Sequence, residues 1–272
     1  MKAEDNYRFI AFVARFAAQL ACQEIMQVYH LEFSVRKKED ASPITDADTA
    51  SDAVIRMVLE TTSIPVISEE QLYMPVNPPE LFWCVDPLDG TREFVKRNGQ
   101  FSVNIALVSK GVPVFGLVAS PVKNCCWYTE SGKVWKYHFE TEKISPCSPE
   151  STRRELVMLS GTLDPKGNAM QSRWLKNAEK IAPLQVEKMG SALKFGAISE
   201  GKADLYIRFG HTHIWDTAAG HALLLCSGGD VYSLETREPL TYSAENTLNP
   251  HFGAFGAGGK EFFLNALKKK LL

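Results

Sequence analysis

The sequence predicts a mixed α/β protein whose two halves follow different patterns of helices and strands. The chain opens on a long apolar helical segment, and strand-like runs then follow one another without intervening helices up to about residue 140. From residue 155 onwards, strands alternate with helices, which is typical of α/β layers. The polar stretch 140–154 separates the two patterns, so we expect an N-terminal α+β half over 1–150 and a C-terminal α/β half over 151–272.

In the first half we expect a helix over about 5–30, a short strand near 32–36 and a second helix. The second helix begins near Thr45–Asp46 and ends before Ile64–Pro65, because the residue before a proline disfavours helix. Short strands are expected at 65–68 and 81–85. The run 101–121 predicts two long strands joined at Lys110–Gly111, followed by strands at "CCWYT" and "KVWKY".

In the second half, three apolar runs predict strands at 155–160, 184–189 and 204–209. Segments with helical spacing separate or follow them, at about 166–179, 191–200 and 215–227.

Composition excludes several classes of protein. The chain has 272 residues, 45% of them apolar, and a net charge of −2, so nothing favours a nucleic-acid polymer as partner. Six scattered cysteines without a CxxC pair indicate reduced thiols in a cytosolic protein, and no signal peptide is evident. The apolar segment 9–31 is interrupted by Arg15, Gln19, Gln23 and Glu24, so we expect a helix packed on the core, with a membrane-surface helix as the alternative.

Acidic residues stand at the ends of apolar segments in three places. "ISEE" places Glu69 and Glu70 after one strand, "DPLDGT" places Asp86 and Asp89 after another, and "IWDTAAG" places Asp216 at the opening of a helix. Each of these acidic motifs alone is compatible with an ordinary helix cap or turn. Together they predict a site for a hard divalent ion such as Mg²⁺, which prefers oxygen ligands.

The "DPLDGT" segment supplies more than carboxylates. The Asp86–Asp89 spacing lets both side chains and the carbonyl of Leu88 face one cavity, and two ions can share a bridging carboxylate. Gly90 lets the chain approach a phosphate closely, and amides near Thr91 can bind it.

These motifs resemble the inositol monophosphatase superfamily of Mg²⁺-dependent, lithium-sensitive phosphatases. The surrounding "DGTREFVKRNGQFSVNIAL", "GSALKF", "LYIRFG" and "IWDTAAGHALL" are similar to its CysQ-type 3′(2′),5′-bisphosphate nucleotidase branch, and the resemblance runs from about Ser42 to Phe252. It implies a five-layer αβαβα fold with the active site between the halves. It also implies a phosphoric monoester hydrolase that removes the 3′-phosphate of 3′-phosphoadenosine 5′-phosphate (PAP), in sulfur metabolism.

The resemblance assigns roles residue by residue. Glu69, Asp86 and the Leu88 carbonyl would bind one Mg²⁺, and Asp86 would bridge to a second ion held also by Asp89 and Asp216. A third, weaker ion would lie near Glu69 and Glu70. The catalytic group would comprise Asp48, Thr91 and Glu70, with Asp48 hydrogen-bonded to Thr91; Asp46 competes for the role of Asp48.

Specificity for a second phosphate requires cations outside the acidic cluster. The implied substrate-binding residues are Asp86, Gly90, Thr91, Ser191, Lys194, Arg208 and Asp216. On the residues alone, Lys194 and Arg208 also suit ordinary solvated charge, as do Lys96 and Arg97 beside the site. The chain departs from the family at "LSGTLDP" (159–165), where a histidine or arginine is common, so contacts with adenine or phosphate there are in doubt.

We therefore expect a cytoplasmic phosphatase, or one at the cytoplasmic face of the inner membrane, that acts on a small bisphosphate nucleotide as a monomer or homodimer. The alternatives are an inositol-1-phosphate or fructose-1,6-bisphosphate phosphatase of the same fold, and a catalytically silent nucleotide-binding homologue.

Overall fold

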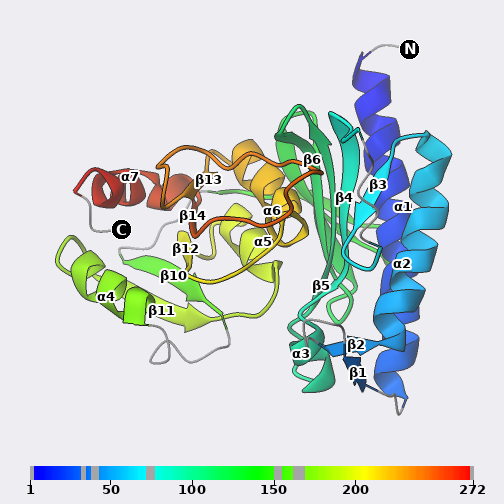
Figure 1. Cartoon of the computed structure of the whole chain (residues 1–272), viewed down its shortest axis with the longest axis horizontal. Coiled ribbons are helices and arrows are strands. Elements are labelled where there is room, and N and C mark those ends of the chain that lie inside the picture. Colours follow the sequence, from blue (N-terminus) through cyan, green and yellow to red (C-terminus); the bar gives the residue numbers. More distant parts are fainter. Residues whose placement is uncertain are drawn as a thin grey trace.

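Five layers are stacked in the computed structural model, which describes residues 3–31, 35–37, 43–71, 77–149, 155–161 and 169–269. They are, in order, a helix pair, a seven-stranded sheet, a second helix pair, a five-stranded sheet and an outer helix pair (Figure 1). The αβαβα sandwich that the resemblance implied is confirmed.

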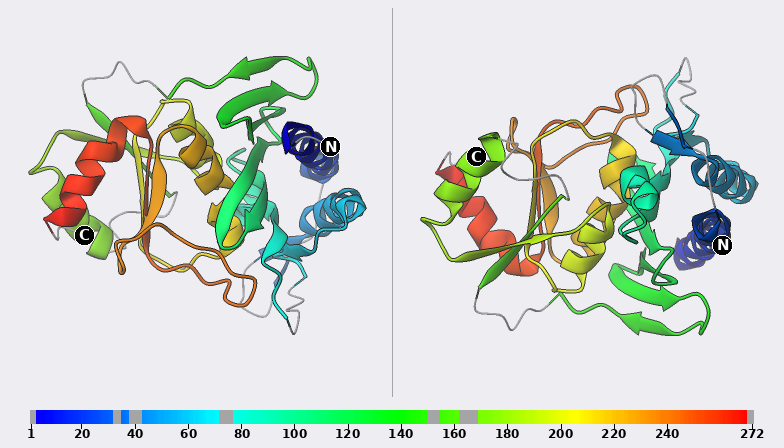
Figure 2. Two further views of the ribbon diagram at one scale, coloured as in Figure 1. Left: turned by 90° about the horizontal axis from the view of Figure 1, so that it is seen from above. Right: turned by 90° about the horizontal axis from the view of Figure 1, so that it is seen from below.

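The first layer consists of α1 (Ala3–His30) and α2 (Asp46–Leu59), which cover one face of the large sheet (Figure 2). Small buried residues such as Ala14 and Ala18 let α1 pack closely. Its segment Tyr7–His30 is long and apolar enough to cross a membrane by length and composition, but half of its most apolar window is buried inside the protein. The expected packing of this helix on the core is therefore confirmed, although Phe12 remains 59% exposed.

The large sheet is a meander in which each strand pairs with the next in the order β3-β4-β5-β6-β7-β8-β9. All neighbours are antiparallel except β3 and β4, which are parallel. The strands are β3 (Val66–Ser68), β4 (Leu81–Asp89), β5 (Ser102–Ser109), β6 (Val112–Ser120), β7 (Cys125–Glu130), β8 (Lys133–His138) and β9 (Ile144–Pro146). The predicted hairpin is confirmed, and both its turn residues, Lys110 (φ 49°) and Gly111 (φ 80°), have left-handed backbones.

The central layer consists of α5 (Leu193–Ser199) and α6 (Ile214–Cys226), which lie between the two sheets (Figure 1). Gly116 of β6 permits this packing, because a Cβ there would overlap the backbone of Ala219 in α6. The close contact fixes α6, and hence its first turn, against the large sheet.

The small sheet has the order β11-β10-β12-β14-β13, with parallel pairs at β11–β10–β12 and antiparallel pairs at β12–β14–β13. Its strands are β10 (Leu156–Ser160), β11 (Leu184–Lys188), β12 (Leu205–Arg208), β13 (Asp230–Ser233) and β14 (Phe252–Phe255). On its outer face lie α4 (Ala169–Ala178) and α7 (Lys260–Lys268). The three strands predicted for this half are confirmed; β13 and β14 were not predicted.

The remaining elements are short: β1 (Val35–Lys37), β2 (Pro43–Thr45), α3 (Thr91–Val95), and 3₁₀ turns at Glu60–Thr62 and Ala257–Gly259. The chain passes from the large to the small sheet between Pro146 and Leu156, inside the expected linker, and one apolar cluster includes residues on both sides, such as Trp127 and Phe195. The division into two units at residue 150 stays a prediction. All six cysteines are free thiols, as expected.

Candidate active site

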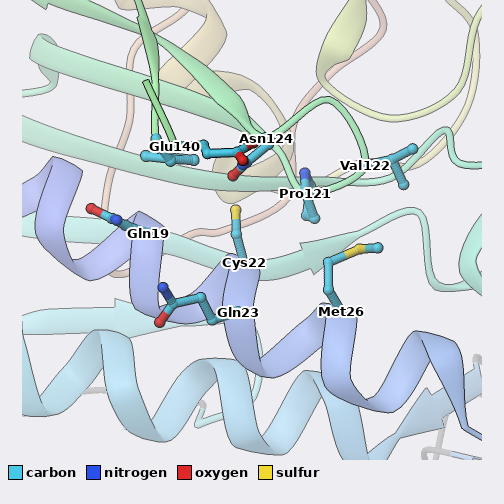
Figure 3. Close-up of a pocket in the computed structure, with 9 residues that line it drawn as sticks. Gln19, Cys22, Gln23, Met26, Pro121, Val122, Asn124 and Glu140 are labelled. Carbon is cyan, nitrogen blue, oxygen red and sulfur yellow. The ribbon is translucent and has the colours of Figure 1, made fainter. Parts of the chain in front are cut away.

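Of two cavities lined by the described residues, one contains the predicted residues. A cavity of about 470 Å³ lies between α1 and the β6–β7 turn, where Cys22 and Met26 face Val122 and Asn124 (Figure 3); Glu140 is the one acid among its described lining residues. The second, of about 610 Å³, lies where the ends of β4, β12 and α6 meet, and all three acidic motifs reach it. It is the candidate active site.

The strand β4 delivers Asp86 and Asp89 to this cavity through an irregularity in its pairing. The register with β5 shifts between the two aspartates, which is the signature of a bulge. Asp86 is 1% exposed, and its Oδ1 accepts a hydrogen bond from the Leu88 amide (3.0 Å). The Asp86–Leu88 turn places Leu88 and both aspartates in the cavity lining, as the spacing predicted.

Gly90 follows directly and has φ +89°, a backbone conformation that glycine adopts without strain. A Cβ at this position would lie 3.2 Å from the carbonyl oxygen of Gln100. The glycine therefore lets the chain turn into α3, and both Gly90 and Thr91 line the cavity.

Glu69 reaches the cavity from β3. Its amide donates to the Val85 carbonyl (3.2 Å), which fixes the end of β3 beside β4. The Glu69 carboxylate lies close enough to Asp86 to raise the pKa of that carboxyl, after burial itself. Glu70 does not line the cavity; its amide donates to Ser68 Oγ (3.3 Å), and its predicted catalytic role stays a prediction.

Asp216 is brought to β4 by the first turn of α6. Carboxylate oxygens of Asp86, Asp89 and Asp216 all lie within 4.8 Å of one another. Desolvation, followed by the charge of Asp89, raises the pKa of Asp216 to about 8. Burial likewise raises the pKa values of Asp86 and Asp89. The charge of Lys194 opposes this rise for Asp89, whereas the neighbouring acids add to it for Asp86, so a further cation would stabilise the ionised cluster.

These residues fit a metal centre. Asp86 Oδ2 is buried and has no hydrogen-bond donor within the described ranges, and a buried acceptor without a donor is costly. The acidic cluster and the Leu88 carbonyl offer oxygen donors, which hard ions prefer; His211 and His213 also line the cavity but are not part of the cluster.

Asp48, rather than Asp46, faces the cavity side of α2. Its Oδ1 accepts from Thr91 Oγ1 (3.1 Å), and its Oδ2 accepts from the Thr45 amide and hydroxyl (both 2.7 Å), forming a capping box. Asp46 is exposed and pairs with Arg36 (2.8 Å). The predicted Asp48–Thr91 contact is therefore present.

The turn before α5 binds Asp89 through its backbone. Ser191 has φ 50°, and the next amide, of Ala192, donates to Asp89 Oδ2 (2.5 Å). Lys194 is 4% exposed and donates to the carbonyls of Met189 (3.2 Å) and Ser191 (2.6 Å). Lys194 thus ties this turn together, and its burial lowers its pKa to about 8.

Arg208 stands at the end of β12 and lines the cavity, as does Lys96. Arg208 Nε is buried without an acceptor among the residues described. Arg97 lies elsewhere: its guanidinium donates to the carbonyls of Tyr29 and Leu31 (the latter at 2.6 Å), at the end of α1. The sequence left open whether Lys96 and Arg97 face the site or the solvent; of these two, Lys96 lines the cavity and Arg97 does not.

Two side-chain amides, those of the buried Asn104 and the partly exposed Gln100, support these residues and were not predicted from the sequence. Asn104 of β5 donates to Asp89 Oδ2 and to the Trp215 carbonyl (both 3.4 Å), and Gln100 Oε1 accepts from the Gly190 amide (2.7 Å). A polar residue inside the apolar run "FSVNIALV" is the signal that could have identified Asn104. Residues 162–165 of "LSGTLDP" lie outside the described residues.

Comparisons with known proteins agree with this geometry. The model of the inositol monophosphatase family matches residues 6–262. The chain is 40% identical over 248 residues to a protein of Shigella flexneri and to one of Escherichia coli K12, both named 3′(2′),5′-bisphosphate nucleotidase CysQ; each match covers 86% of this chain and 95% of the relative.

Solved structures agree. That of CysQ from Bacteroides thetaiotaomicron, described as a bacterial member of the inositol monophosphatase family, matches with a TM-score of 0.79 and 32% identity, covering 94% of this chain and 98% of the other. An inositol monophosphatase of Thermotoga maritima shares the fold at 21% identity, with a TM-score of 0.72 and coverage of 97% and 99%. With a family match over nearly its whole length and relatives at 40% identity, the chain belongs to the inositol monophosphatase family.

Proposed function

We propose that this protein is a Mg²⁺-dependent, lithium-sensitive 3′(2′),5′-bisphosphate nucleotidase that converts PAP to AMP and phosphate. One observation carries the proposal: the Asp86–Asp89–Asp216 cluster and the half-buried Arg208, whose Nε is buried, line the same cavity. A substrate with two separate phosphates suits an acidic metal site beside a cation that has an unused donor. The names of the relatives at 40% identity support the same substrate class.

The metal-binding residues would be Glu69, Asp86, Asp89, Asp216 and the carbonyl of Leu88. We propose that these residues would hold two Mg²⁺ ions, and that Glu69 with its neighbour Glu70 would help to hold a third, weaker ion. When bound, the ions would activate water and neutralise charge on the phosphoryl oxygens.

Thr91 and Asp48 would orient the attacking water and accept the proton that it loses. Thr91 Oγ1 donates its hydrogen toward Asp48 Oδ1, so its lone pairs can accept a hydrogen bond from a water in the cavity. Asp48 keeps its position because its other oxygen is fixed by two donors from Thr45. The water oxygen bonds to phosphorus, the bond to the 3′-oxygen breaks, and AMP leaves once that oxygen is protonated.

The second phosphate would be bound beside the acidic cluster, by Arg208 with the Ser191 turn and Lys194. Arg208 offers a forked guanidinium whose Nε is not engaged within the described residues. Lys194 already donates to two carbonyls, so its contribution is one remaining N–H and its charge.

Phosphate release from PAP and from inositol-1-phosphate, measured side by side in Mg²⁺ with and without lithium, tests the proposal. We expect lithium-inhibited turnover of PAP and little turnover of the monophosphate. Arg208→Ala should lower kcat/KM for PAP about 10- to 100-fold, the value of one or two charge-assisted hydrogen bonds, and change the monophosphate rate little. Arg173→Ala, an exposed arginine on the outer helix α4, is the matched control.

Each alternative predicts a different result. An inositol-1-phosphate or fructose-1,6-bisphosphate phosphatase would prefer its own ester and be indifferent to Arg208→Ala. A silent homologue would bind PAP in calorimetry and release no phosphate at saturating Mg²⁺.

A cytoplasmic location and assembly as a monomer or homodimer belong to the same proposal. The burial of half of the apolar window of α1 supports a helix that packs on the sheet rather than one that crosses a bilayer. Fractionation of cells, with and without a high-salt wash of the membranes, tests the location, and light scattering tests the assembly.

A further inference from the structure

The first turn of α6 is bound from outside the cavity by the segment 247–249. The Ile214 amide donates to the Thr247 carbonyl (2.8 Å), and His213 Nδ1 lies 3.1 Å from Thr247 Oγ1. His213 and Leu248 form an isolated antiparallel bridge. Thr247 is 34 residues along the chain from His213 at the first turn of α6, so the contact is made only by folding.

Asn249 makes the densest set of these contacts. The two hydrogens of its Nδ2 are shared among three acceptors, the carbonyl of His213 (2.6 Å) and the hydroxyls of Thr217 (3.0 Å) and Thr212 (3.3 Å). Its own amide donates to the Thr212 carbonyl (2.9 Å). The His213 carbonyl can only accept, so it fixes the orientation of the Asn249 amide, which is 6% exposed.

The position of Asp216 depends on the residue that Asn249 holds. His213 is the N-cap of α6, and its amide donates to Asp216 Oδ2 (2.5 Å) in a capping box. One carboxylate oxygen of Asp216 is therefore tied to the backbone of His213, in a carboxylate that also keeps an oxygen within 4.8 Å of those of Asp86 and Asp89.

We propose that Asn249, assisted by Thr247, is a positioning residue for Asp216: by holding the backbone of His213, it sets the carboxylate that completes the metal site. The proposal rests on the metal site of the proposed function, but not on its substrate. Asn249 is not among the residues that line the cavity, so it touches neither substrate nor metal and acts through His213.

Asn249→Asp provides a sharp test, because it keeps the shape of the side chain and replaces the two Nδ2 hydrogens with an acceptor facing the His213 carbonyl. The matched control is Asn246→Asp in the same loop. Asn246 is exposed, and its Oδ1 accepts from the Leu248 amide (3.2 Å), a contact that an aspartate retains.

Mn²⁺ would be titrated into each metal-free protein and free ion counted by electron paramagnetic resonance, with folding checked by circular dichroism. We expect Asn249→Asp to weaken Mn²⁺ binding about 10- to 100-fold, the usual cost of removing a group that orients a metal ligand. Asn246→Asp should bind as the wild type does. Affinity of folded Asn249→Asp within twofold of the wild type would overturn the proposal.

Two further outcomes are decided by the titration, the second of them together with an assay of PAP hydrolysis. If Asn249→Asp does not fold, Thr247→Val replaces it: this variant loses only the hydroxyl beside His213 Nδ1 and should weaken Mn²⁺ binding several-fold, and an unchanged affinity would overturn the proposal. If the wild type binds Mn²⁺ with the predicted dependence on Asn249 but does not hydrolyse PAP, the proposed function fails and the positioning role stands.

Discussion

The acidic and cationic sides of the cavity differ in how completely the protein itself satisfies them. On the acidic side, Asp86, Asp89 and Asp216 crowd within 4.8 Å, and Asp86 Oδ2 has no donor in the described part of the chain. On the cationic side, Lys194 has two carbonyl partners, while Arg208 keeps an unengaged Nε. The acidic side thus lacks the charge compensation that a bound cation would supply. The cationic side combines Lys194, which is held by its own turn, with Arg208, which we propose binds the substrate.

We expect the greatest loss of activity when one acid of the cluster is replaced. In Asp216→Asn, the side-chain oxygen can still accept from the His213 amide, so α6 keeps its cap and the chain should fold. Loss of the charge should lower PAP turnover about 10³-fold or more, at least the cost of losing a preorganised stabilising group. Phosphate release in saturating Mg²⁺ measures the effect.

Asp46→Asn is the control for this variant. Asp46 is the other acid that the sequence left as a candidate, and its exposed pair with Arg36 should contribute little to stability. We expect this variant to retain wild-type turnover. An Asp216→Asn enzyme with more than a tenth of the normal rate would remove Asp216 from the metal site.

Two variants on the cationic side separate a cation that stabilises the fold from one that is available to a ligand. Lys194→Met leaves the carbonyls of Met189 and Ser191 without donors, and each buried group left unpaired costs about 1–3 kcal/mol. Arg208→Met removes a buried Nε that has no acceptor in the structure described, so its free energy of unfolding should change less. Urea denaturation in EDTA measures the free energy of unfolding of both variants. Equal losses of stability would show that Lys194 and Arg208 do not differ in this way.

The sequence predicted the acidic side better than the cationic side, for a physical reason. Asp86, Leu88 and Asp89 lie within four consecutive residues of β4, so local chain geometry brings them together, and the strand before them was evident from its apolar run. The Asp48–Thr91 contact was found through the family resemblance and is present in the structure.

What escaped prediction depends on contacts between distant segments. Nothing in "GSALKF" shows that Lys194 folds back on the carbonyls of its own turn, and nothing in "FVKRNGQ" shows that Arg97 binds the end of α1. Strands β13 and β14 have four residues each, and β14 reads "FGAF", so periodicity could not reveal them. Asn249 acts on a helix that begins 35 residues earlier, a relationship that only the folded chain displays.

The smallest expected effect concerns the acidic side in the absence of metal. The folded-state pKa of Asp216 is about 8 against an ordinary value of 3.8, and the pKa of Asp86 is raised in the same direction. The folded state therefore binds more protons than the unfolded state between these values, so stability declines as pH rises from about 4 through about 8. The Tm of the protein in EDTA should fall by several degrees between pH 5.5 and pH 8.

Mg²⁺ should reverse this trend, because it binds the ionised carboxylates and becomes a stronger stabiliser as protons leave. The stabilisation by Mg²⁺ should thus grow from pH 5.5 to pH 8, and it should be smaller in Asp216→Asn, which has one fewer carboxylate to ionise. Above pH 8 the cationic side has the opposite effect on stability. The pKa of Lys194 is lowered to about 8, so the folded state loses this proton more readily than the unfolded state does, and this opposes any further decline in Tm. A Tm in EDTA that rises steadily from pH 5.5 to pH 8 would mean that the three acids are not crowded together without an ion.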